Sequence, residues 1–252
     1  MSKIYLFDVD GTLTPPKQKI DPIFSEDFLS WTKDKEVYIV SGGSFLRIVD
    51  QLGMPIVNNM QGIFACMGNV FYQRREQVNP SGMEEWETIY ENNFGFPKRL
   101  TEKLRQNVDA SPFPDKAEPH WEQRPGMLNY SVIGCNAPQS VREKYVAYDL
   151  ESQERVRIVR RLARRYPELD FVIGGAVSID IFNKGNDKSQ VIPRYFEEAL
   201  EHNQIHFVGD RIPSPGNDHA LAESLRTHKN GYAYEVETWK DTAELLKTDP
   251  FA

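Results

Sequence analysis

The sequence predicts an α/β protein in which a parallel sheet flanked by helices is interrupted by an inserted α+β domain. Strand and helix signals alternate at the start of the chain and again after residue 185. Between these stretches, residues 84–184 mix helical apolar stripes with short alternating strands. We therefore expect a core domain formed by residues 1–83 and 185–252, and an inserted domain formed by residues 84–184.

The N-terminal part of the core shows three apolar runs that predict buried strands, at residues 4–7, 37–40 and 63–66. Asp21 and Pro22 predict the N-cap and the first turn of a helix between the first two strands. The apolar stripe within residues 45–52 predicts a second helix, which Gly53 ends. Strands that alternate with helices in this way predict βαβ units and a parallel sheet.

The inserted segment carries two helical stripes, one over Leu100–Val108 and one over Val156–Tyr166. Its alternating strands fall at residues 127–133 and 177–181, so we expect two helices packed on a few antiparallel strands. Strands at 205–208 and 232–236 then alternate with helices at 217–225 and 238–246, which returns the chain to the core.

The composition narrows the possible functions. The chain has 252 residues and a net charge of -7, which argues against a broad nucleic-acid or anionic-membrane surface. No apolar run approaches the ~20 residues of a membrane helix, and the two cysteines lack metal-ligand spacing. We therefore expect a cytoplasmic protein with no nucleic-acid or membrane partner. The arginines between Arg155 and Arg165 are best interpreted as a solvated helix face, because an apolar stripe occupies the opposite face.

The first candidate for chemistry is Asp8-Val9-Asp10-Gly11-Thr12, which directly follows the first strand. Ligands of open α/β sheets bind beyond the carboxyl ends of the strands. One carboxylate can attack phosphorus while the other handles the proton of the transferring oxygen. Two anions can approach a phosphate only with a divalent cation. A simple turn after a strand explains the pattern about as well.

Three further segments favour phosphoryl transfer, although each is weak alone. Ser41 and Ser44 open the helix after the second strand, where hydroxyls and free N–H groups suit a phosphate. Lys188 begins a later helix and could neutralise charge on the phosphoryl group. Three residues that come after a late strand offer hard oxygen ligands of the kind that Mg²⁺ binds: Asp210, Asn217 and Asp218.

The order of these four segments resembles the motifs of the haloacid dehalogenase (HAD) superfamily of phosphotransferases. Further segments resemble the eukaryotic-type phosphomannomutase family: Arg124–Ser131 (RPGMLNYS), Gly174–Phe182 (GGAVSIDIF) and Pro215–Asp218 (PGND). The resemblance covers nearly the whole chain. It implies a Rossmann-like HAD core with an inserted substrate-specificity cap, and a magnesium-dependent mutase that interconverts mannose 6-phosphate and mannose 1-phosphate.

The resemblance also implies roles for individual residues. Asp8 would be the nucleophile and Asp10 the general acid/base, with Ser41 and Lys188 completing the catalytic set. Mg²⁺ would be held by Asp8, the Asp10 carbonyl and Asp210, with Asn217 and Asp218 as nearby supports or ligands. The substrate would meet Lys17, Ser44, Arg124, Arg142, Ser178 and Asp180. Ser178 and Asp180 lie two apart on a strand, so both face one side. A hexose 1,6-bisphosphate activator and a homodimer through the cap are implied too.

The sequence departs from the family pattern at several positions. Ala117 and Cys135 stand where the family usually has phosphate-binding arginines, Lys17 replaces an arginine, and Asn186 replaces a tryptophan. Lys116 and His120 are close enough in sequence to compensate in part. These departures leave three hypotheses: a phosphohexomutase, a sugar-phosphate phosphatase on the same scaffold, and a non-catalytic sugar-phosphate-binding protein. The intact Asp8, Asp10, Lys188 and Asp210 argue against the third.

Overall fold

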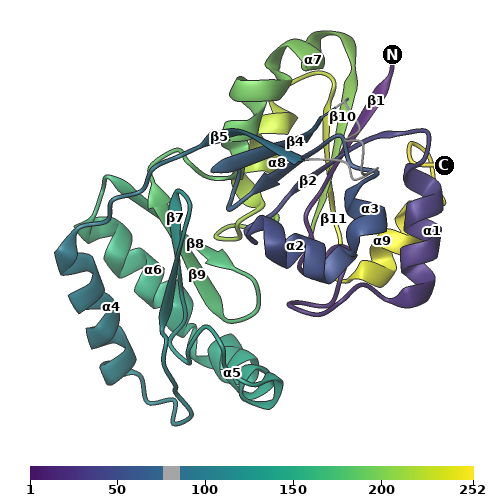
Figure 1. Ribbon diagram of the computed structural model, residues 1–252. Coiled ribbons are helices and arrows are strands. Elements are labelled where there is room, and N and C mark those ends of the chain that lie inside the picture. Colours follow the sequence, from purple (N-terminus) through teal and green to yellow (C-terminus); the bar gives the residue numbers. More distant parts are fainter. Residues whose placement is uncertain (76–85) are drawn as a thin grey trace.

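The computed structural model describes residues 1–75 and 86–252, and it confirms the predicted α/β fold (Figure 1). The core sheet has the order β11-β10-β1-β2-β3-β4-β5. Its first five strands run parallel, whereas β4 and β5 are antiparallel to their neighbours. The strands are β1 (Lys3–Phe7), β2 (Glu36–Val40), β3 (Gly62–Ala65), β4 (Val70–Arg74), β5 (Trp86–Glu91), β10 (Gln204–Gly209) and β11 (Gly231–Glu235).

Helices cover both faces of this sheet, because successive side chains of a strand point to opposite faces. In β1, Tyr5 and Phe7 belong to one apolar cluster, and Ile4 and Leu6 belong to the other. The helical elements of the core are α1 (Pro22–Thr32), α2 (Phe45–Leu52), α3 (Met54–Val57), η1 (Lys188–Gln190), η2 (Ile192–Phe196), α7 (Glu197–His202), α8 (His219–Arg226) and α9 (Trp239–Leu245).

The residues from which the helix ends were predicted have the expected roles in the structure. The Asp21 carboxylate accepts hydrogen bonds from the backbone N–H groups of Ile23 and Phe24 at the start of α1. Gly53 ends α2 with a φ of 79°, a conformation that glycine adopts without strain. The local sequence therefore sets the positions of both helices that flank the first two strands.

The inserted domain is a four-stranded antiparallel sheet of order β6-β7-β9-β8 with helices packed on it. Its elements are α4 (Lys98–Ala110), β6 (Trp121–Arg124), β7 (Met127–Tyr130), α5 (Gln139–Ser152), α6 (Glu154–Arg165), β8 (Leu169–Gly174) and β9 (Ser178–Asn183). We expected two helices, and the sequence showed no apolar stripe for α5. The reason is that its buried residues, Arg142, Tyr145 and Asp149, have helical spacing but are largely polar.

The strand β5 is placed differently from the expectation. Residues from 84 onward were assigned to the inserted domain, yet Trp86–Glu91 pairs with β4 and extends the core sheet. The expected boundary itself, between residues 83 and 84, lies outside the described residues. Mostly exposed positions along β5 leave no apolar alternation from which its partner sheet could be predicted.

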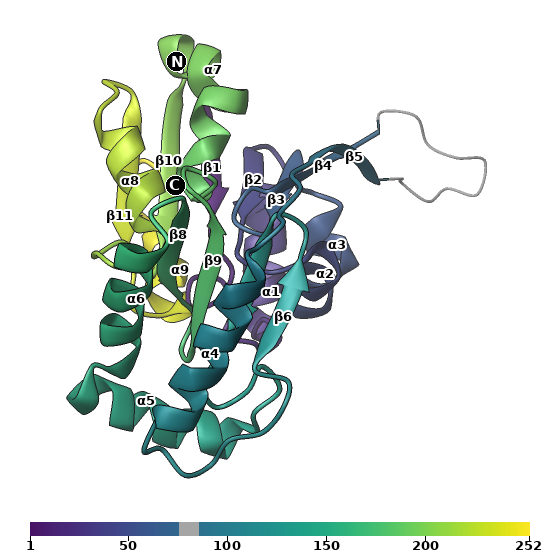
Figure 2. The ribbon, with the colours of Figure 1, turned by 90° about the vertical axis from the view of Figure 1, so that its left-hand side faces the viewer.

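The inserted domain lies against the carboxyl ends of the parallel strands (Figures 1 and 2). Met127 and Phe182 of this domain are fully buried in the same cluster as Met67 of the core. The backbone N–H of Ile173 donates to the carbonyl of Pro215 across the two domains at 3.0 Å. The inserted domain therefore acts as a cap in direct contact with the end of the sheet where chemistry is expected.

Candidate active site

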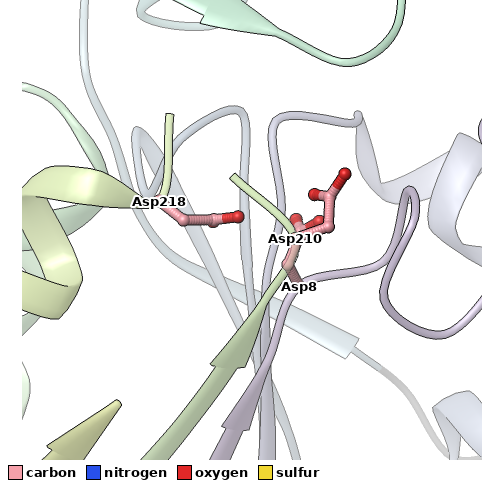
Figure 3. A group of neighbouring side chains, drawn as sticks. All are labelled: Asp8, Asp210 and Asp218. Atoms are coloured by element: carbon pink, nitrogen blue, oxygen red, sulfur yellow. The ribbon is translucent and has the colours of Figure 1, made fainter. Parts of the chain in front are cut away.

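An acidic cluster lies at the carboxyl ends of two neighbouring strands (Figure 3). Asp8 follows β1, Asp210 follows β10, and the parallel pairing of these strands brings both carboxylates together. Asp218 directly precedes α8 and points toward them. One oxygen from each of the three lies within 4.8 Å of the others. The structure thus brings together three of the residues that the sequence singled out.

Lys188 supplies a positive charge to this cluster, and its side chain is fully buried. Its ammonium group donates to Asp8 Oδ1 at 2.6 Å and to Asp218 Oδ1 at 2.7 Å. Burial alone would lower the pKa of Lys188, but Asp218 and Asp8 outweigh burial and raise the pKa above its ordinary value. Lys188 therefore stays charged next to the carboxylate that is expected to react.

The pKa values of the carboxylates are shifted upward. Burial, with the negative charge of Asp218 adding to it against the attraction of Lys188, raises the pKa of Asp8 to about 7. Burial together with Asp8 and Asp218 raises the pKa of Asp210 to about 8. The Lys188 ammonium and the Arg211 guanidinium, 3.1 Å from Asp210 Oδ2, are two positive charges against three carboxylates. A further positive charge would stabilise their ionised forms.

The donor set fits a hard divalent cation. Lys188 occupies one oxygen of Asp8, and Asp210 directs a carboxylate into the same space. The side-chain oxygen of Asn217 is buried and has no hydrogen-bond donor among the described residues. Asp218 is different, because its two oxygens accept from Lys188 Nζ and the backbone N–H of Arg211. Asp8, Asp210 and Asn217 therefore present oxygen atoms of the kind that Mg²⁺ takes, whereas both Asp218 oxygens already accept hydrogen bonds.

Gly11 shows how closely the first loop approaches this cluster. Its φ is +92°, and a Cβ atom there would lie 2.4 Å from Asp210 Oδ2. Only glycine satisfies both the left-handed backbone and the close contact. The glycine after the Asp-x-Asp pair is therefore required by the packing of the acidic cluster, beyond its role in a turn.

Asp10 is held by neighbours that the other carboxylates lack. Its Oδ1 accepts from the backbone N–H of Lys17 at 2.6 Å and from Gln51 Nε2 at 2.8 Å. Gln51 also donates to Thr14 Oγ1 at 3.1 Å, so it fixes the whole loop after β1. Asp10 lines the same cavity as Asp8, and one oxygen held by these donors leaves the other for proton transfer.

The two serines at the start of α2 have different surroundings. Ser41 is buried, lines the cavity, and its hydroxyl accepts from the backbone N–H of Gly43 at 3.1 Å. Ser44 is the N-cap of α2 and does not line this cavity. Of the two, the structure places Ser41 beside the acidic cluster, and Ser44 contributes to the helix end.

The same cavity also has cationic lining residues, which are called its cationic end below. They are Lys17 and Arg47 from the core and Arg124 and Arg142 from the cap. Arg124 Nη1 donates to the carbonyl of Gly42 at 2.8 Å and Nη2 pairs with Glu122 at 2.8 Å, but Nε has no partner. The buried Nη1 of Arg142 likewise has no partner among the described residues. Unpaired buried donors at one site indicate that an anion belongs there.

Lys17 bridges the two domains at this end. Its ammonium donates to the carbonyl of Cys135 in the cap at 3.1 Å. Burial, together with the positive charges of Arg142 and Arg47, lowers the pKa of Lys17 to about 8. The pKa of the Cys135 thiol is raised by burial, so position 135 adds no charge to the site.

Ser178 and Asp180 line the cavity from β9, as their spacing predicted. Asp180 is buried, and its Oδ1 accepts from Asn129 Nδ2 at 2.6 Å. Burial raises the pKa of Asp180, against the lowering effect of Arg124. A Cβ atom on Gly174 would lie 2.1 Å from Asp180 Oδ2, so the glycine leaves room for this carboxylate. Carboxylate and amide groups held this way can recognise sugar hydroxyls.

Sequence reasoning missed Arg47 and Asn129, and it misjudged two possible compensating residues. Lys116 donates to the carbonyls of Val108 and Ser111, and the His120 ring contacts the Ser131 carbonyl at 3.2 Å. Neither lines the cavity. Arg47 could have been found from its place on α2, one turn after the serine-glycine loop. Asn129 could have been found within the Arg124–Ser131 segment.

The fold and the arrangement of the site are those typical of the HAD class of phosphotransferases. Solved structures with this fold include an IMP-nucleotidase of Plasmodium falciparum, with a TM-score of 0.63 and 13% identity over 100% of this chain and 71% of that chain. A haloacid dehalogenase-like hydrolase from Bacteroides thetaiotaomicron has a TM-score of 0.57 and 14% identity, covering 98% of this chain and 99% of that one. At such identities, the likeness shows the fold alone.

The sequence comparisons identify the family within this class. The chain belongs to the eukaryotic phosphomannomutase family, whose model matches residues 25–249. A phosphomannomutase of Dendrobium officinale is 34% identical, covering 97% of this chain and 92% of its own length. A phosphomannomutase of Drosophila melanogaster is 31% identical, covering 96% of this chain and 93% of its own length. The resemblance seen in the motifs is thereby confirmed.

The membrane question has a separate answer. Among residues 1–75 and 86–252, no helix combines the length and the apolar character needed to cross a bilayer.

Proposed function

We propose that this protein is a magnesium-dependent phosphohexomutase that interconverts mannose 6-phosphate and mannose 1-phosphate. One observation carries the proposal: a single cavity is lined by Asp8, Asp10 and Asp210 and also by the cations Lys17, Arg47, Arg124 and Arg142, while Lys188 contacts Asp8 from behind the lining. A hexose bisphosphate has two phosphates separated by a sugar, and it needs a reacting site and a holding site at once. Family membership and the names of the relatives support the same substrate.

Asp8 and Asp10 have different roles in the proposed reaction. In the phosphorylated enzyme, Asp8 carries the phosphoryl group. The substrate hydroxyl attacks phosphorus, the bond from phosphorus to Asp8 Oδ breaks, and Asp10 accepts the hydroxyl proton. After the bisphosphate turns round, Asp8 attacks its other phosphate and Asp10 returns the proton to the leaving oxygen. Bound Mg²⁺ would supply charge neutralisation on the phosphoryl oxygens.

The cationic end would hold the phosphate that is not reacting. Guanidinium groups match phosphate oxygens as paired donors, and the unpartnered atoms of Arg124 and Arg142 are free to do so. Asp180 and Ser178 line the same cavity and can contact sugar hydroxyls. This arrangement binds either end of the sugar in either direction, as a mutase requires.

The cap must move during the cycle. The free volume of the cavity between the two domains is about 30 Å³. A hexose phosphate is far larger, so entry requires the cap to swing away from the core. Closure afterwards excludes water, which would otherwise hydrolyse the aspartyl-phosphate.

A coupled assay that records isomerisation and phosphate release on the same samples tests the proposal. With Mg²⁺ and a catalytic amount of hexose 1,6-bisphosphate, mannose 6-phosphate should convert to mannose 1-phosphate with little free phosphate. Steady phosphate release without isomerisation would instead establish the alternative, a sugar-phosphate phosphatase. That alternative is favoured by the uncharged Cys135 thiol at the cationic end and by Ala117, which is exposed and outside the cavity.

Magnesium binding can be measured independently of turnover. Mg²⁺ should raise the melting temperature of the wild-type protein, because a ligand that binds the folded state stabilises it. The Asp210→Asn variant should lose this response. An unchanged melting temperature in wild type at millimolar Mg²⁺ would contradict the assignment of the metal residues. The homodimer through the cap and the cytoplasmic location stay predictions, and light scattering at micromolar concentration tests the former.

A further inference from the structure

A groove of about 870 Å³ lies between α4 and α6 on the cap, and it shares no lining residue with the catalytic cavity. Both helices are visible side by side in the lower part of Figure 1, and hydrogen bonds join them, from Tyr166 Oη after α6 to the Arg99 carbonyl of α4 and from Arg161 to Asn107. The groove is lined by six cationic side chains: Lys103, Arg157, Arg160, Arg161, Arg164 and Arg165.

No carboxylate lines the groove among the residues that the structure describes. The single acidic residue of α6, Glu154, is buried and accepts from Tyr145 Oη at 2.9 Å. Arg155 is also buried, where it pairs with Asp149 at 2.7 Å, so it does not belong to this surface. The outward arginines repeat at spacings of three and four residues, which places like charges next to one another. This repulsion destabilises the helix when no anion is bound.

The floor of the groove holds an unsatisfied donor. Asn107 is only 7% exposed, and its Oδ1 accepts a hydrogen bond from Arg161. Its Nδ2 is buried and has no partner in the described part of the chain. A buried amide donor without an acceptor is unfavourable. This donor is shielded from solvent, so an anion seated among Asn107, Arg160 and Arg161 would satisfy it once these side chains shift.

The lining also indicates the kind of anion. Within residues 1–75 and 86–252, Leu162 and Ala110 are the only apolar residues that line the groove, and no aromatic ring lines it. Nucleotide bases need stacking surfaces, and peptides need pockets for side chains. Guanidinium forks instead match the oxygens of phosphate groups. A second copy of the chain would present the same positive face in a symmetric contact.

We propose that this groove is a binding site for an oligophosphate, meaning a small anion with several linked phosphate groups. The arginines from 157 to 165 span about 12 Å along the helix, at 1.5 Å per residue, which suits a chain of a few phosphates. The volume falls within the roughly 300–1,000 Å³ of small-molecule sites. The site would give the cap a second anion-binding surface that does not depend on the catalytic reaction.

Calorimetric titration with sodium tripolyphosphate in magnesium-free buffer of low ionic strength tests this proposal. Binding to wild type is expected to weaken at least about tenfold in the Arg160→Gln/Arg164→Gln variant, because charge-assisted hydrogen bonds are lost. The matched control, Lys33→Gln/Lys229→Gln, removes two exposed lysines of the core and should bind as wild type does. Equal weakening in both variants would show a general charge effect and overturn the proposal.

Three further titrations distinguish a specific site in the groove from its alternatives. Asn107→Leu keeps the net charge but removes the floor donor, and it should weaken binding; unchanged binding would overturn the site. Lys17→Gln/Arg142→Gln disables the cationic end of the cavity and should leave tripolyphosphate binding intact. Loss of binding there would assign the anion to the cavity instead. Tighter binding of an oligoglutamate peptide or a single-stranded oligonucleotide than of tripolyphosphate would overturn the oligophosphate assignment.

Discussion

The acidic and cationic ends of the catalytic cavity differ in whether their polar atoms have hydrogen-bond partners. At the acidic end, Lys188, Asp8 and Asp218 satisfy one another through hydrogen bonds of 2.6–2.7 Å in a buried network. At the cationic end, Arg124 and Arg142 keep buried nitrogen atoms without partners. The acidic end comes entirely from the core, whereas the cationic end is assembled from both domains.

This difference matches what each end has to do. The reacting groups must keep one geometry through two phosphoryl transfers, and a closed network of charged partners holds them. The holding end must accept a phosphate, release it and accept the other, so its donors have to be available when the cavity is empty. Each of the following predictions tests one part of this contrast.

The largest effect is expected at the acidic end. Asp8→Asn should reduce isomerisation by at least about 10⁴-fold, because the amide cannot form the aspartyl-phosphate. The metal-free variant should nevertheless melt no lower than wild type at pH 8. The raised pKa of Asp8 means that folding favours its protonated form, so stability falls as pH rises from about 4 through about 7. A neutral side chain removes that loss.

Thermal melts of both proteins at pH 5 and pH 8 measure this contribution, and coupled assays measure the activity. The wild type should lose stability between the two pH values, and Asp8→Asn should lose less. Retained isomerisation in Asp8→Asn would remove the nucleophile from the mechanism.

The next effect is expected at the cap side of the cationic end. Arg142→Gln should raise KM for mannose 6-phosphate about 10- to 100-fold, since a charge-assisted hydrogen bond contributes about 1.5–3 kcal/mol. Its melting temperature should hold or rise, because the unpartnered buried Nη1 is removed. Arg99→Gln, at an exposed position of the cap, is the matched control. A large fall in melting temperature would mean that Arg142 supports the cap rather than the substrate.

A smaller effect is expected on the core side of the same end. Arg47 is half-buried and lines the cavity, so Arg47→Gln should raise KM about three- to tenfold. Hydrolysis of p-nitrophenyl phosphate, which has no second phosphate, should change little. If Arg47→Gln reduced both reactions equally, Arg47 would act at the reacting phosphate and the division into two ends would fail there.

The acidic end was more predictable from the sequence than the cationic end. Asp8, Asp10 and Asp210 follow strands, so the alternation that predicts the parallel sheet also predicts that they meet at one edge. Arg142 could be suspected only through the family resemblance, because its helix α5 buries polar residues and shows no apolar stripe. Arg47 was missed, although its place on α2 one turn after the serine-glycine loop was a usable signal. The strand β5 was misplaced because its mostly exposed positions show no apolar alternation.

The finest test concerns the charge of Lys17, which lies between the two domains. Its pKa of about 8 places the loss of its proton just above neutrality. Below that pH the ammonium can bind phosphate, and above it the amine cannot, so kcat/KM should fall as pH rises through about 8. The fall in kcat should come at a higher pH, because bound phosphate favours the ammonium. Lys17→Arg keeps a positive charge across this range and should abolish the fall in kcat/KM. If Lys17→Arg retained the full decline above pH 8, another group would be responsible, and the cationic end would not depend on a bridging lysine.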